Sequence, residues 1–183
     1  MLVNTAAPTD STNEKQNQTK EENPVISPDG KHTAYLVQTN QPMISTGLGD
    51  ALHNQIWLKS NSETDSILLI DSRNSENMEM VLGSINGLKF APDGDYLYFK
   101  SNAWATSDAI HRVNIKTHEE SFVTAGNTLD IVINGKFKGY LIVSKHKYYP
   151  QGGSYDDFWL LSPDGKEIKN LGDTMPDSEY PIR

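Results

Sequence analysis

The residues of this sequence best suited to contact another molecule are large side chains that fall between the apolar, strand-like stretches. We predict that the binding residues are Met43, Trp104, His146, Tyr148, Tyr149, Tyr155, Asp156 and Asp157. Tyr and Trp join a large apolar surface to a polar tip, and they are enriched among the residues that dominate binding energy at protein interfaces. The alternative is that these rings fold back and cover strands of their own chain.

His146 and the carboxylates of Asp156 and Asp157 form the combination closest to a metal or acid–base site. Neighbouring residues on a strand point to opposite faces, so two adjacent carboxylates do not converge. Asp side chains in such hairpins are better explained as acceptors for backbone N–H groups. The five histidines are scattered, and none has the ligand spacing of an H-E-x-x-H motif. We therefore predict no catalytic residue, no metal and no cofactor.

The composition excludes several classes of protein. The 183-residue chain has no Cys, which excludes disulfides, thiol nucleophiles and Cys-based zinc sites. Sixteen Lys and Arg against 24 Asp and Glu give a formal net charge of -8, which repels phosphate backbones, so we expect no nucleic-acid partner. No apolar run approaches the roughly 20 residues needed to cross a bilayer, so we expect no transmembrane segment.

The elements that must position these residues repeat along the chain. The stretch 25–36 contains Pro-Asp-Gly between an apolar stretch and an alternating strand, and 88–99 repeats it almost position for position. A third, degenerate copy over 131–143 has Asn134-Gly135 at its turn. Pro presets the first turn dihedral and Gly supplies a positive φ, so each copy predicts a β-hairpin.

Two further strands follow each predicted hairpin. The third strands are expected near 56–59, 110–113 and 158–161, and the fourth near 67–70, 121–124 and 167–171. A long insertion, from about residue 39 to 54, lengthens the first unit. Four strands in each of three units of roughly 40–50 residues, with no convincing helix, predict an all-β chain of propeller blades. His111 takes the place that Trp occupies in the sister repeats, so we expect it to be packed.

The Pro-Asp-Gly hairpins, followed by Ile-Trp-Leu-Lys and Phe-Trp-Leu-Leu strands, resemble the TolB-type (PD40, WD40-like) β-propeller repeat over about 23–171. This resemblance implies three propeller-like, four-stranded antiparallel blades. The chain departs from the repeat at Asn134-Gly135, which lacks Pro-Asp, and at His111. The same family includes peptidase domains, envelope proteins and pure binding modules, so the resemblance indicates architecture rather than chemistry.

We divide the chain into a disordered polar tether (1–23), a TolB-like propeller-blade domain (24–173) and a C-terminal tail (174–183). The polar leader is similar to the spacer behind the lipid-bearing Cys of bacterial lipoproteins. It favours the bacterial periplasm or cell envelope, with a lipid anchor upstream of residue 1; a cytoplasmic tail is the alternative. Three blades are fewer than the four of a closed propeller. Either two chains close a six-bladed homodimer, or the tail covers an edge, or a partner does.

Strand positions with large side chains are expected to pack between the sheets: Val25, Tyr35, Val37, Trp57, Leu68, Phe90, Tyr96, Tyr98, Leu141, Val143, Trp159 and Leu161. For function, the sequence favours a non-catalytic module that recognises a protein partner, and an inhibitor or immunity protein is one version of this hypothesis. The alternative is a hydrolase or a hydrolase-accessory propeller domain.

Overall fold

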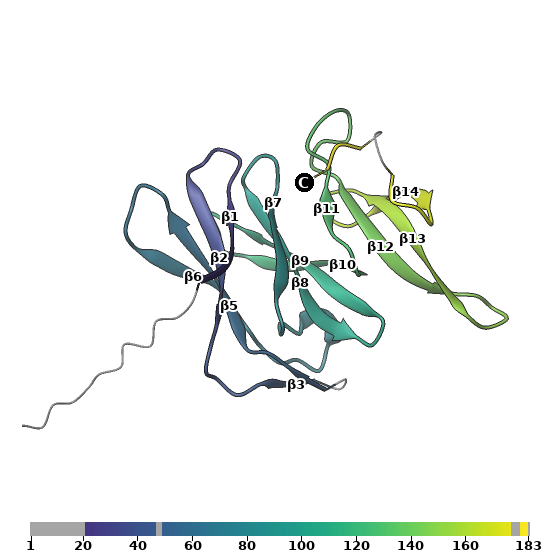
Figure 1. The fold of residues 1–183 in the computed structure, drawn as a ribbon, viewed down its shortest axis with the longest axis horizontal. Helices are drawn as coiled ribbons and strands as arrows, with labels where there is room; N and C mark the ends of the chain where they lie inside the picture. Colours follow the sequence, from purple (N-terminus) through teal and green to yellow (C-terminus); the bar gives the residue numbers. More distant parts are fainter. Residues whose placement is uncertain (1–20, 47–48, 177–179, 183) are drawn as a thin grey trace, which may run out of the picture.

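The computed structural model of the chain consists of strands arranged in three four-stranded antiparallel sheets (Figure 1). It describes residues 21–46, 49–176 and 180–182. The predicted polar tether therefore lies outside the described residues up to residue 20. Its last part does not, because the first strand begins at Glu21.

Each sheet is a meander of four strands, and we call the three sheets blades 1, 2 and 3. Blade 1 consists of β1 (Glu21–Ile26), β2 (His32–Gln38), β5 (Asn54–Ser60) and β6 (Ser66–Asp71). Blade 2 consists of β7 (Asn86–Phe90), β8 (Tyr96–Trp104), β9 (Ser107–Asn114) and β10 (Glu120–Gly126). Blade 3 consists of β11 (Asp130–Ile131), β12 (Leu141–Tyr148), β13 (Ser154–Leu161) and β14 (Glu167–Gly172). These quartets confirm the predicted all-β, bladed architecture.

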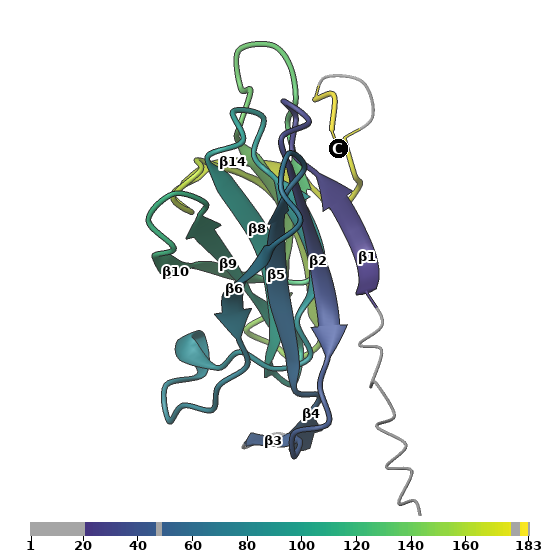
Figure 2. The same cartoon turned by 90° about the vertical axis from the view of Figure 1, so that its left-hand side faces the viewer.

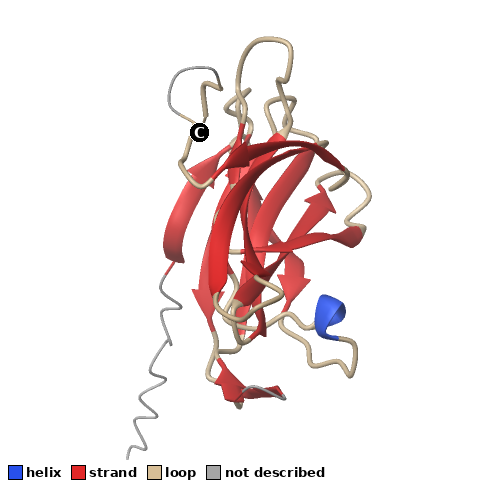
Figure 3. Ribbon diagram, turned by 90° about the vertical axis from the view of Figure 1, so that its right-hand side faces the viewer, coloured by secondary structure: helices blue, strands red, loops and turns tan. Residues whose placement is uncertain are grey.

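Two small elements lie outside the blades. The insertion of the first unit forms a short hairpin of β3 (Ile44–Thr46) and β4 (Gly49–Ala51) at one end of the molecule (Figure 2). Among the described residues the single helix is a three-residue 3-10 turn, η1 (Met78–Met80), visible as the blue segment in Figure 3. The described part of the chain thus offers no helix with the length and apolar character to span a membrane.

The Pro-Asp-Gly turns form as their local chemistry predicts. In the first, Gly30 has a φ of 72° and its N–H donates to the Ser27 carbonyl over 2.9 Å. Asp29 accepts from the Ser27 hydroxyl at 2.7 Å and from the Lys31 N–H at 3.0 Å. These bonds stabilise the ionised carboxylate and lower the pKa of Asp29 from 3.8 to about 2. The Asp residue is therefore a turn residue, as the sequence predicted.

The apolar side chains pack between neighbouring blades. One cluster, which includes Ile56, Leu97 and Phe99, fills the space between blades 1 and 2, and a second, which includes Tyr98, Ile110 and Leu141, joins blades 2 and 3. The expectation for Leu68 is wrong, because this side chain is 42% exposed. It pairs with Trp57 on the face of blade 1 that points away from blade 2, where the part of the chain that the structure describes places no further blade. Trp57 is only half-buried for the same reason.

The C-terminal residues cover the far face of blade 3. The buried ring of Tyr180 packs in a cluster with Ile142 and Leu160, and Ile182 forms an antiparallel bridge with Val132. The Ile133 N–H donates to the Pro181 carbonyl at 2.8 Å. One end of the arc of blades is therefore closed by residues that the sequence placed in a separate tail.

Candidate functional site

The hairpin of β12 and β13 extends as a long two-stranded ribbon at one side of the molecule, ending in the loop at the lower right of Figure 1. Its register is regular from Leu141–Leu161 to Tyr148–Ser154. The turn beyond is closed by a bond from the Gly152 N–H to the Tyr149 carbonyl at 3.0 Å and one from the Tyr149 N–H to the Gly153 carbonyl at 3.1 Å. We call residues 146–156 the aromatic hairpin; it holds five of the eight predicted binding residues, and Asp157 follows it directly.

One face of the aromatic hairpin carries His146, Tyr148 and Asp156. His146 lies directly opposite Asp156 in the ladder, and its Nδ1 is 3.0 Å from the Asp156 carboxylate. The Tyr148 ring meets the imidazole edge to face, with a centroid distance of 4.9 Å. The carboxylate thus orients His146, and His146 in turn supports the Tyr148 ring.

The opposite face carries Tyr155 and the basic side chains of the ribbon. The Tyr155 and Tyr149 rings lie 4.5 Å apart between centroids. Lys147 Nζ lies 5.4 Å from the centre of the Trp159 ring, a cation–π geometry. Lys145 binds Glu167 at 2.6 Å, and this hydrogen bond lowers the pKa of the Glu167 carboxyl. The ammonium groups of Lys145 and Lys147 are therefore both held by neighbours.

The two adjacent aspartates do not converge. Asp156 faces His146, whereas Asp157 accepts a hydrogen bond from the Asn170 amide at 2.9 Å on the neighbouring strand. The described residues contain no group of three or more His, Asp or Glu placed to hold a metal ion. The contacts of these two carboxylates are therefore those of a structured hairpin.

Tyr148 and Tyr149 point into solvent at the end of this structure, with 66% and 46% of their surfaces exposed. They are held on the protein side, because Tyr148 contacts His146 and Tyr149 contacts Tyr155. The Tyr148 hydroxyl also lies 3.2 Å from the hydroxyl of Thr106, in the turn between β8 and β9. The tips of blades 2 and 3 are therefore joined at this surface.

The remaining two predicted residues lie outside the aromatic hairpin. Trp104 ends β8, packs edge to face on Phe122 at 6.2 Å, and lines a hollow with residues 49–51 and Asp108. Met43 is exposed in the connection that precedes β3. The structure thus brings Tyr148, Tyr149, Tyr155, His146 and Asp156 together, while Trp104 joins this group only through Thr106, two residues further on.

Comparison with solved structures identifies the fold. The β-propeller domain of the trilobed protease from Pyrococcus furiosus, described as having an open velcro topology, superposes with a TM-score of 0.53 at 12% identity, covering 87% of this chain and 43% of that one. The acylaminoacyl peptidase from Pyrococcus horikoshii also gives a TM-score of 0.53 at 12% identity, covering 85% and 25%. TolB from Acinetobacter baumannii gives 0.45 at 15% identity, covering 87% and 44%. The chain is a partial β-propeller.

The chain spans less than half the length of each of these three structures. No protein-family profile matches the sequence, and no curated protein matches it. The similarity therefore supports the propeller fold, and the function has to be argued from the site.

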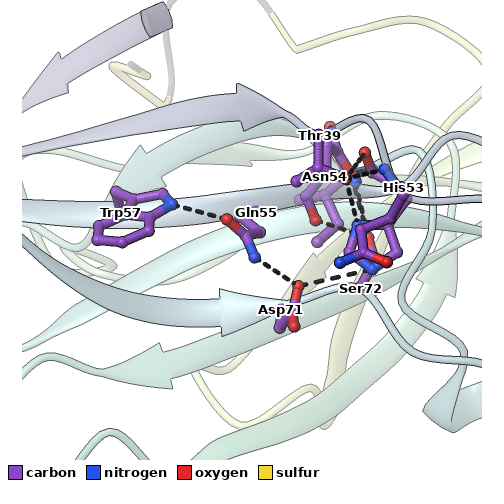
Figure 4. A network of polar contacts seen from close by, with 9 residues as sticks. Thr39, His53, Asn54, Gln55, Trp57, Asp71 and Ser72 are labelled. Atoms are coloured by element: carbon purple, nitrogen blue, oxygen red, sulfur yellow. Dashed lines mark hydrogen bonds and ion pairs between the residues drawn. The ribbon is translucent and has the colours of Figure 1, made fainter. Parts of the chain in front are cut away.

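The first and last blades of a partial propeller each have an outer face. On the outer face of blade 1 lies a polar network that sequence reasoning missed (Figure 4). The Trp57 indole N–H donates to the Gln55 amide oxygen at 3.0 Å, and the Gln55 amide donates to the Asp71 carboxylate at 2.9 Å. His53 Nε2 lies 3.7 Å from the same carboxylate oxygen. The signal that could have found it lies in β5, where Gln55 and Trp57 share one face of the strand while the apolar Ile56 and Leu58 lie on the other.

The network includes a hydroxyl, an imidazole and a carboxylate, because His53 Nδ1 lies 2.8 Å from the Thr39 hydroxyl. This hydroxyl is engaged in local structure. It accepts from the Gln41 N–H at 3.2 Å and lies 3.3 Å from the His53 carbonyl oxygen. Thr39 therefore ties the start of the insertion to the start of β5, which is a structural role.

Proposed function

We propose that this partial propeller is a non-catalytic protein-recognition module of the bacterial cell envelope, built from TolB-type PD40 repeats, and that it binds its partner through the aromatic hairpin. The observation that carries the proposal is the exposure of Tyr148 and Tyr149 at the tip of an ordered ribbon. The other exposed large apolar side chains of the described residues lie outside the aromatic hairpin.

The order of the aromatic hairpin favours binding. Holding a side chain in its bound position before association reduces the conformational entropy lost on binding. Tyr148 is held by His146 and Thr106, and Tyr149 by Tyr155. The two rings therefore present large, rigid apolar areas with hydroxyl tips, which is the chemistry of interface anchors.

The charge of the chain favours a basic partner. A net charge of -8 attracts a positively charged protein over a distance set by the salt concentration. A small acidic domain that covers a basic enzyme fits this description, so an inhibitor or immunity protein is the specific form of the proposal. The association rate should then fall as ionic strength rises.

The test compares the unmodified chain with a Tyr148→Ser, Tyr149→Ser double variant as baits for proteins from the cell envelope. Ile168→Ser is the matched control, because Ile168 is also exposed and lies on β14, away from the aromatic hairpin. We expect a partner that the unmodified chain and the control retain and that the double variant loses. Equal recovery from all three baits would remove the aromatic hairpin from the proposal.

The alternative of a hydrolase or hydrolase-accessory domain is favoured by the peptidases among the similar structures. A panel of peptide, ester and glycoside substrates tests it, with Asp157→Asn as the variant. Turnover by the unmodified chain that this variant lacks would overturn the proposal of a non-catalytic module.

A further inference from the structure

The two ends of the arc of blades are built differently. The far face of blade 3 is covered by Tyr180 and Ile182 of the same chain. The outer face of blade 1 is covered only in part among the described residues: Leu68 is 42% exposed and Trp57 is half-buried, whereas Tyr35 beside Trp57 is buried. Blade 1 is therefore the end of the arc whose outer face the described residues leave partly uncovered.

The outer face of blade 1 is organised in rows across its strands. Tyr35, Trp57 and Leu68 are cross-strand partners and form the central, apolar row. Counted along β5 from Trp57, the cross-strand pair Gln55–Asp71 lies two residues away in one direction, and Lys59 lies two residues away in the other. An acidic end, an aromatic centre and a basic end thus follow each other along one face.

The two charged ends of this face are not engaged with each other. Asp71 contacts Gln55 and His53, and its side chain remains 52% exposed. Lys59 has no carboxylate partner among the described residues. The two groups are four residues apart along the strands, or about 14 Å at about 3.4 Å per residue, which is too far for a direct ion pair.

We propose that this face binds a second copy of the chain about a two-fold axis that lies between the two sheets and crosses the strands at the row of Trp57. Such an axis reverses the strand direction of the second copy. It lays Trp57 and Leu68 against the same row of the partner and places each Lys59 over the partner's Gln55–Asp71 pair. An acidic end and a basic end on either side of an apolar centre are self-complementary in this arrangement only.

The covered face of blade 3 explains why the association stops at two copies. A head-to-tail contact would join the outer face of blade 1 to the far face of blade 3, as in a six-bladed ring. That face is already filled by Tyr180 and its neighbours. A two-fold contact uses one patch from each copy and leaves no further face to extend, so the dimer is closed.

The experiment measures the mass of the full chain by sedimentation equilibrium over a concentration series. We expect a monomer–dimer equilibrium whose dissociation constant rises by about tenfold or more in Lys59→Glu and in Asp71→Lys, since close interfacial charge pairs have couplings of this size. The double variant Lys59→Glu, Asp71→Lys should return to the original value. Within one chain these two side chains are too far apart to compensate each other, so rescue would identify a contact between copies.

Two matched controls separate the face of blade 1 from general surface effects. Leu68→Asp should abolish the dimer, whereas Ile168→Asp should preserve it, because both residues are similarly exposed on the outermost strand of a terminal blade. Lys169→Glu on β14 is the control for Lys59→Glu.

Three outcomes overturn the proposal. They are a monomer at every concentration, a dimer that survives Leu68→Asp, and a dimer weakened by both charge variants but not restored in the double variant. If the chain becomes dimeric only after residues 1–20 are removed, its own N-terminal segment occupies the face instead. If a different protein binds this face while the chain alone stays monomeric, the second copy is likewise excluded.

Discussion

Nδ1 of His111 lies 2.6 Å from the Glu120 carboxylate in the interior of blade 2. The imidazole is fully buried, stacked on Phe99 at 5.3 Å and met edge to face by Phe122 at 5.8 Å. The other carboxylate oxygen of Glu120 binds Arg73, which precedes η1 in the connection between blades 1 and 2. Glu120 therefore joins the middle of one blade to the chain that arrives from the previous one.

Replacing Glu120 by Ala should destabilise the protein by about 3 kcal/mol, because it leaves His111 and Arg73 without their shared partner. The estimate is at the low end of the range for buried pairs, since Arg73 is 41% exposed. Urea unfolding at neutral pH measures the change. The control is Glu119→Ala, an exposed neighbour, which should change the free energy of unfolding by less than about 0.5 kcal/mol. Equal effects of the two variants would contradict a bridging role.

The Glu120 carboxylate should also make the stability of the protein depend on pH. Burial alone raises the pKa of Glu120, but hydrogen bonds from His111 and Arg73 outweigh it and hold the pKa below its usual value of 4.5. A lowered pKa in the folded state means that the contribution is fully present above pH 4.5 and is lost as pH falls through the folded value. The difference in unfolding free energy between the unmodified chain and Glu120→Ala should thus shrink as pH falls below 4.5. Urea melts at a series of acidic pH values test this, and a constant difference would contradict it.

The first Pro-Asp-Gly turn makes a prediction for a single carboxylate. Ser27→Ala removes the main hydrogen bond that lowers the pKa of Asp29 to about 2, so this pKa should rise toward 3.8. The Lys31 N–H still donates to the carboxylate, so the shift should stop short of that value. NMR titration of the Asp29 side chain in the unmodified chain and in Ser27→Ala measures this pKa.

Close packing between blades 2 and 3 depends on a glycine. A Cβ built on Gly126 would lie 2.2 Å from Val143 Cγ1 and 3.0 Å from the Ser144 carbonyl oxygen. Gly126→Ala must therefore push β10 from β12, and we expect a loss of about 2–3 kcal/mol, as for other overpacked sites. Gly135→Ala is the contrast: nothing lies within 4 Å of its Cβ, and only the strain of its positive φ, about 1 kcal/mol, applies. Thermal unfolding of both variants should show the larger drop for Gly126→Ala.

Whether a feature could be predicted depends on how far apart in the sequence the residues that form it lie. Gly30 and its turn follow from five neighbouring residues, which is why local chemistry predicted the hairpins and the blades. The bridge from Arg73 to Glu120 spans 47 positions, and no pattern within one repeat indicates it. Leu68 was misplaced because its repeat resembles the others, whereas its burial depends on a further blade, and the described residues form none beside it. For the site, the aromatic content of the hairpin was visible in the sequence, but its separation from Trp104 and Met43 depends on how the blades are stacked.

The C-terminal residues give the sharpest test of how the arc of blades ends. Tyr180 is buried against Phe137, with 5.9 Å between ring centres, on the far face of blade 3. Tyr180→Ala should lower the free energy of unfolding by about 3–5 kcal/mol, since it empties the space of a large ring. The Tyr180 hydroxyl has no hydrogen-bond partner among the described residues, so Tyr180→Phe removes an unsatisfied polar group and should leave the stability unchanged or slightly higher. Chemical denaturation of the two variants separates packing from hydrogen bonding. A Tyr180→Ala protein as stable as the unmodified chain would show that these residues do not hold the end of blade 3, and a large loss in Tyr180→Phe would show that the hydroxyl is bonded.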